Sequence, residues 1–115
     1  MNTVREVTAM TNNEAIRAYV NGTMKRGAVN HIGWNNDRFI NYSTELCHID
    51  REAGTALFNT RKYSATTSKI QSSLRRALEA AGFEIIEVEG EPAYIWNAGY
   101  MGAERVTMED VYRWI

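Results

Sequence analysis

The chain has 115 residues, of which 44% are hydrophobic and 23% charged, with a formal net charge of -1 at pH 7. These values are ordinary for a globular protein and predict a single domain, residues 1–115, with one modest core. The only cysteine, Cys47, excludes an internal disulfide, and no apolar run approaches the ~20 residues that span a bilayer. The first ten residues carry charge and no apolar core, so we expect no signal peptide. We therefore expect a soluble cytoplasmic protein.

The first predicted element is a short helix in residues 11–22. Thr11 and Glu14 have the spacing of a capping box, in which each side chain satisfies a free backbone N–H of the other. Gly22 stands where a glycine ends helices. The apolar face of this helix contains Ile16, Tyr19 and Val20.

Three strands follow in the prediction, over residues 28–34, 38–49 and 55–60. The segments between them, residues 35–37 and 50–54, have the Asn, Asp and Gly content of turns. Connections of this length are too short for parallel crossovers. The pattern therefore predicts a three-stranded antiparallel meander.

A second helix is predicted from about Thr66 to Ala81, ended by Gly82. Its apolar stripe has helical spacing and contains Ile70, Leu74, Ala77, Leu78 and Ala81. The opposite face carries Lys69, Ser72, Ser73, Arg76 and Glu79.

The last part of the chain predicts a second hairpin, residues 83–90 and 92–96, then a glycine-rich loop and a helix from Thr107 to Ile115. The predicted order is α-β-β-β-α-β-β-α. Neither a helix stripe nor a sheet face can be buried alone, so we expect an α+β domain with an antiparallel sheet and helices packed on one face.

The most informative functional feature is a cationic segment. Residues 59–76 contain five basic side chains and no acidic one, whereas residues 77–115 are strongly acidic. The first N–H groups of a helix attract anions, and nearby hydroxyls and cations strengthen that attraction. The predicted partner- or phosphate-binding residues are Arg61, Lys62, Ser64, Thr66, Thr67, Lys69 and Arg76. Simple capping by Ser or Thr is the alternative for any one hydroxyl.

Other chemistry has weaker support. Cys47 and His48 are adjacent in a predicted strand and should point to opposite faces, and with His31 they lack a fourth ligand, so no metal site is predicted. No phosphate loop, nucleophile elbow or catalytic acid pair is present. We therefore predict no cofactor and no enzymatic activity. The acidic residues Glu84, Glu87, Glu89 and Glu91 are expected on a solvated face. Beside the basic helix they would form a dipolar surface that favours a homodimer or steers a charged partner.

Two resemblances bear on function. The segment with Tyr63, Ser64, Thr66, Thr67, Ser68, Lys69 and Gln71 resembles a Y-S-x-T-T-S-K-x-Q segment of an uncharacterised domain of bacteriophage proteins, which also has the Tyr-Ser/Thr pair seen at Tyr42. The resemblance covers residues 38–81 and implies a small phage-encoded accessory protein acting in a host cell. Such proteins are often inhibitors, including anti-CRISPR and anti-defence factors.

The predicted order of a helix, three strands and a helix is also similar to the double-stranded-RNA-binding domain, although the turn at residues 35–37 lacks that family's Gly-Pro-x-His feature. Two hypotheses follow. The first is an inhibitor that occupies the surface of a host protein or ribonucleoprotein, such as a CRISPR effector. The second is a nucleic-acid-binding protein that contacts phosphates through residues 61–76.

Overall fold

The computed structural model describes residues 10–92. They form an α+β unit in which two helices accompany one six-stranded mixed sheet. The helices are α2 (Asn12–Asn21) and α3 (Ala65–Ala80). The strands are β1 (Arg26–Val29), β2 (Ile32–Asn35), β3 (Arg38–Asn41), β4 (Thr44–Asp50), β5 (Thr55–Asn59) and β6 (Glu84–Val88).

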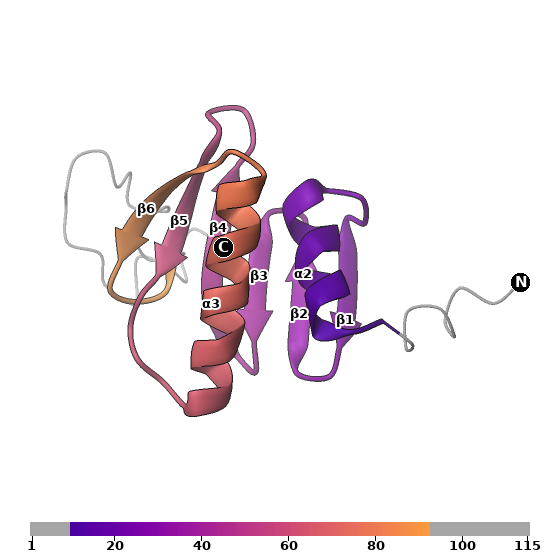
Figure 1. Cartoon of the computed structure of the whole chain (residues 1–115), viewed down its shortest axis with the longest axis vertical. Coiled ribbons are helices and arrows are strands. Elements are labelled where there is room, and N and C mark those ends of the chain that lie inside the picture. The colour runs from indigo at the N-terminus through magenta and orange to yellow at the C-terminus, as the bar shows by residue number, and fades with distance from the viewer. Residues whose placement is uncertain (1–9, 93–115) are drawn as a thin grey trace, which may run out of the picture.

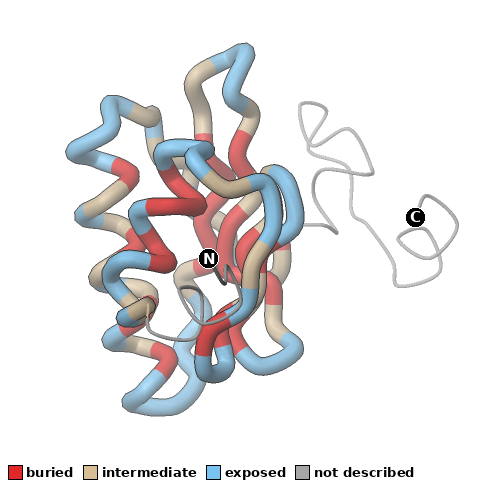
Figure 2. Tube along the Cα trace, turned by 90° about the vertical axis from the view of Figure 1, so that its right-hand side faces the viewer, coloured by how far each residue is buried: buried red, intermediate tan, exposed pale blue. Residues whose placement is uncertain are grey.

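The sheet follows chain order, β1-β2-β3-β4-β5-β6. Each pair from β1 to β5 is antiparallel, and β6 alone runs parallel to its neighbour β5. Helix α2 lies over β1 and β2, and α3 lies beside it and contacts β5 and β6 (Figure 1). Both helices lie on the same side of the sheet, where the buried residues gather (Figure 2).

Both helices begin where the sequence predicts. At α2, the Thr11 hydroxyl accepts from the backbone N–H of Glu14, and the Glu14 carboxylate accepts from that of Thr11, so the predicted capping box is confirmed. Gly22 follows α2 in the left-handed conformation that closes the helix. Helix α3 spans 16 residues, with Ile70, Leu74 and Leu78 of its predicted stripe buried.

The predicted strands over residues 28–34 and 38–49 are each two strands. The first turns at Asn30 and His31 between β1 and β2, and the second turns at Tyr42 and Ser43 between β3 and β4. Asn30 and Tyr42 have positive φ angles of 54° and 60°, the conformation that reverses a chain in two residues. Neither turn contains glycine, so the apolar alternation concealed both. The predicted antiparallel meander is confirmed, but it has five strands where three were predicted.

The predicted antiparallel sheet is also corrected at its last strand. Residues 84–88 do form a strand, but it pairs with β5 in parallel. A parallel connection needs a crossover of a dozen or more residues, and α3 supplies it. The expected strand at residues 92–96 and the expected helix at 107–115 lie almost wholly outside the described residues.

The core lies between the helices and the sheet. Phe39 of β3 is fully buried, and its ring centroid lies 5.0 Å from that of Tyr19 of α2. Trp34 of β2 donates its indole N–H to the Met24 carbonyl and covers Gly27, where an added Cβ would lie 2.4 Å from the ring. The first contact holds α2 against β3, and the second packs β2 against β1 and the loop that follows α2. Among residues 10–92, no helix has the length and apolar character to cross a membrane.

Candidate functional site: a basic groove along helix α3

Helix α3 presents its charged face to solvent because its apolar stripe is fixed on the sheet. Leu74 and Leu78 are completely buried, while Lys69, Ser72 and Arg76 are exposed. Lys69 and Arg76 are seven residues apart, which is close to two helical turns and about 10 Å along the axis. Cations at this spacing line one side of the helix.

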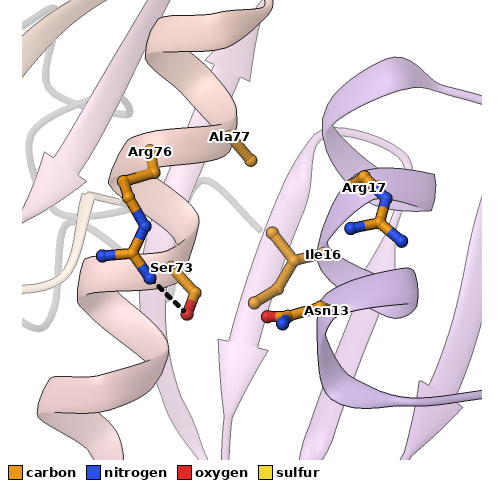
Figure 3. A pocket seen from close by; sticks show the side chains of 6 residues that line it. All are labelled: Asn13, Ile16, Arg17, Ser73, Arg76 and Ala77. Carbon is orange, nitrogen blue, oxygen red and sulfur yellow. Dashed lines mark hydrogen bonds between the residues drawn. The ribbon is translucent and has the colours of Figure 1, made fainter.

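The first depression on this surface lies between the two helices and has a volume of about 250 Å³. Ile16 of α2 and Ala77 of α3 stand between two arginines, Arg17 on α2 and Arg76 on α3 (Figure 3). Arg76 donates to the Ser73 hydroxyl at 3.3 Å, a contact that leaves its positive charge uncompensated. The depression therefore has an apolar centre with a cation on each side.

Two further depressions continue this surface along α3. One is lined by Ser68, Lys69, Ser72, Ser73 and Arg76. The other, of about 360 Å³, reaches Lys62 in the loop before the helix. Arg76 borders all three depressions. Neighbouring depressions also share Ser68, Ser72 or Ser73. We call the surface that the three depressions form together the basic groove, and its polar and charged residues used below are Asn13, Arg17, Lys62, Ser68, Lys69, Ser72, Ser73 and Arg76.

The loop that carries Lys62 is held in place from both ends. The Gln71 side-chain amide donates to the carbonyls of Asn59 and Arg61 at 2.8 and 3.1 Å. Thr60 donates through its backbone N–H and its hydroxyl to the Val88 carbonyl. The loop is therefore preorganised, and a partner would not have to order it on binding.

The cations of the groove are not neutralised by the acidic strand. Arg75 does pair with Glu87, at 2.7 Å, and also lies over the Phe58 ring at 4.8 Å. Within residues 10–92, however, Lys62, Lys69 and Arg76 form no ion pair. Glu84, Glu87 and Glu89 are exposed, as the sequence predicted, whereas Glu91 is half-buried and accepts from the Glu45 backbone N–H at 2.8 Å. The positive face therefore remains open beside the acidic one.

Some of the hydroxyls at the start of α3 are buried and others are exposed to solvent. Ser64 is the helix cap, since its hydroxyl accepts from the Thr67 N–H. Thr67 is only 4% exposed and donates to the Asn41 side chain at 2.7 Å, so its hydroxyl does not reach a partner and its predicted contact role is corrected. Arg61 and Thr66 are exposed at the helix start, outside the depressions.

Sequence reasoning missed Asn13 and Arg17, which form the α2 side of the groove. Their positions depend on the packing of α2 beside α3, and nothing in a local pattern indicates that two helices separated by all of residues 22–64 will be neighbours. A usable signal did exist, because Arg17 lies next to the apolar Ile16 and so at the edge of the buried stripe of α2.

The cysteine of the chain and its neighbouring histidine lie on opposite sides of the sheet. Cys47 is buried on the helix side of the sheet, opposite Phe39 and Phe58 in register, and the adjacent His48 points to the other side. Residues 10–92 contain no group of three potential metal ligands. Burial raises the pKa of the Cys47 thiol from 9.0 to about 12, so the thiol stays protonated at neutral pH and is a poor nucleophile.

The raised pKa of Cys47 predicts a loss of stability in alkali. The unfolded thiol ionises above pH 9 and the folded one only near pH 12, so the free energy of unfolding should fall as pH rises through this interval. Three pKa units correspond to roughly 4 kcal/mol. Urea unfolding at pH 8 to 11 measures this slope. Cys47→Ala should flatten it in part, because burial also raises the pKa of Tyr19; an unchanged slope would contradict the assignment to Cys47.

Comparison with known proteins identifies no relative: no family model, no curated protein and no solved structure matches this chain.

Proposed function

We propose that this domain is a binding protein that contacts the phosphate backbone of a nucleic acid through the basic groove. The observation that carries the proposal is that Lys62, Lys69 and Arg76 lie along one face without an ion-pair partner among residues 10–92, with Arg17 across the groove. Phosphate contacts by Lys and Arg supply most of the affinity of sequence-independent nucleic-acid binding.

The chemistry between the cations also suits phosphate. Ser68, Ser72 and Ser73 place hydroxyl donors between Lys62, Lys69 and Arg76 on the same surface. Hydroxyls and cations together are the usual donors to phosphate oxygens. The groove is open, so it suits an extended backbone better than an enclosed small molecule.

A second candidate is the inhibitor that occupies a surface of a host protein or ribonucleoprotein, in the manner of a phage accessory or anti-defence factor. The observation that favours it is Tyr63, which is 39% exposed beside Lys62 and is held by a hydrogen bond from Asn59 to its hydroxyl. Fixed tyrosines are frequent anchors of protein interfaces. In a ribonucleoprotein the same groove would face the nucleic-acid component.

Salt dependence separates these two functions. For binding to a fluorescent 20-base-pair duplex RNA or DNA, we expect the logarithm of the affinity to fall linearly with the logarithm of the salt concentration, with a slope of about -3 for three to four phosphate contacts. Fluorescence anisotropy between 50 and 300 mM salt gives this slope. Duplex binding with a slope near zero, or no duplex binding at 50 mM salt, would reject the phosphate proposal.

A pair of single variants tests whether the positive charge acts locally. Glu79→Lys adds a cation to α3 next to the groove, and Glu52→Lys makes the same charge change in the exposed turn between β4 and β5. Glu79→Lys should strengthen duplex binding and steepen the salt slope by about one, whereas Glu52→Lys should have the smaller effect. Equal effects would indicate that only the net charge matters.

A further inference from the structure

A second aromatic feature lies at one end of the sheet, where two turns meet. His31 in the β1–β2 turn and Tyr42 in the β3–β4 turn stack with ring centroids 4.4 Å apart and an interplanar angle of 16°. The Tyr42 backbone N–H and the Asn41 side-chain amide both donate to the His31 carbonyl, so the two turns are tied together. We call the stacked pair the aromatic shelf.

Tyr42 occupies an unfavourable position for a tyrosine. Its φ angle is 60°, a left-handed conformation that bulky residues rarely adopt, and its side chain is 55% exposed. An Asn or Gly would satisfy this turn with less strain. Neither burial nor backbone preference explains why a tyrosine occupies position 42. A strained, exposed aromatic residue indicates contact with a binding partner.

The shelf borders an open depression of about 460 Å³ on the side of the sheet away from the helices. Gly33 and Ile40, paired across β2 and β3, form its floor, because they alternate with the core residues Trp34 and Phe39. A Cβ added at Gly33 would meet only the Gly27 carbonyl oxygen, at 3.9 Å. The absence of a side chain at Gly33 leaves this space beside the shelf.

Several of the residues around this depression are polar, and one of them is cationic. Asn35 and Asn30 line the depression, but the Asn30 amide already donates to the Asn12 side chain of α2 at 2.7 Å, so Asn35 is the available amide. Arg26 pairs with Asn35 in register at the far end of the depression. Asp37, the one acid between residues 22 and 44, is already bonded to Arg51 at 2.9 Å. A ligand that is flat, has hydrogen-bonding edges and carries negative charge matches this combination of groups.

We propose that the aromatic shelf is a stacking site for an unpaired nucleobase of single-stranded RNA or DNA, with the amide of Asn35 along the base edge and Arg26 toward the phosphate. The inference deepens the proposed function, since it adds recognition of single strands to the phosphate contacts of the groove. Every base has a flat face, so stacking on an aromatic ring does not depend on which base is bound. An unpaired base exposes that face, whereas a base inside a duplex does not, so the site should select single strands.

The test uses eight-residue oligo-dT and oligo-rU with the full chain. Both oligonucleotides should shift the NMR resonances of the His31 and Tyr42 rings, and these shifts should persist in the groove variant Lys69→Glu/Arg76→Glu. Tyr42→Asn should lower the affinity for single strands by about 5- to 150-fold, the range for loss of one base–aromatic stack. Its affinity for a duplex and its melting temperature should not fall.

Gly33→Val supplies an independent variant, because it fills the floor and leaves both rings in place; it should weaken single-strand binding as well. Tyr42→Phe keeps the ring and should bind like the wild type. Three results would overturn the shelf. The first is that the oligonucleotides leave the ring resonances of the wild type unshifted, and the second is that the shifts vanish in the groove variant. The third is that a proline-rich peptide, added in place of the oligonucleotides, produces the same shifts. Shelf shifts in a protein that binds no duplex would instead retain the shelf and reject the groove.

Discussion

The double variant Lys69→Glu/Arg76→Glu should bind a 20-base-pair duplex at least about 30-fold more weakly than the wild type at 0.15 M salt, since each lost phosphate contact removes about 0.7 of a decade in affinity at that salt concentration. The two cations lie on the exposed face of α3 and form no ion pair within residues 10–92. The reversed charges add repulsion to this loss. Anisotropy titrations over a series of salt concentrations should also show a slope reduced by about two.

The fold of this variant should be intact, because neither side chain contributes to the core. An unchanged circular dichroism spectrum and melting temperature check this. The variant Lys69→Gln/Arg76→Gln removes the charges without reversing them. Its duplex affinity should lie between that of the charge-reversed variant and that of the wild type. Wild-type affinity in the charge-reversed protein would exclude the groove as the contact surface.

Phe39→Ala should lower the free energy of unfolding by about 3–5 kcal/mol, the range for removing a large aromatic side chain from a core. Phe39 is fully buried, packs against Tyr19, and lies between Trp34 and Cys47 in the sheet register. The loss would act on the groove as well, because Tyr19 attaches α2 to the sheet and Arg17 is two residues before it. Urea unfolding followed by tryptophan fluorescence measures the change.

Phe39→Leu is the matched control, since it keeps most of the volume and should cost about 1–1.5 kcal/mol. The Tyr19 hydroxyl donates to the Asp37 carbonyl at 2.7 Å, so α2 retains one tie to the β2–β3 turn in both variants. A loss below 1.5 kcal/mol in Phe39→Ala, about that of the control, would show that the contact between Tyr19 and Phe39 does not anchor α2.

Local patterns predicted the two helices well, and the sheet less well. The capping box at Thr11 and the apolar stripe of α3 are properties of neighbouring residues, and both are confirmed. The turns at Asn30 and Tyr42 escaped notice because they use positive φ angles without glycine. The parallel pairing of β6 was missed because a short alternating strand has no signal for the direction of its partner.

For the functional surface, the sequence by itself determined which residues carry charge and that α3 turns Lys69 and Arg76 away from its apolar stripe, because helical periodicity follows from local geometry. Only the tertiary structure decided that Arg17 stands across from Arg76, that Thr67 is buried against Asn41, and that His31 stacks on Tyr42. Each of these pairs joins residues 11 to 59 positions apart. Such contacts depend on strand register and helix packing, which are set by the whole core at once.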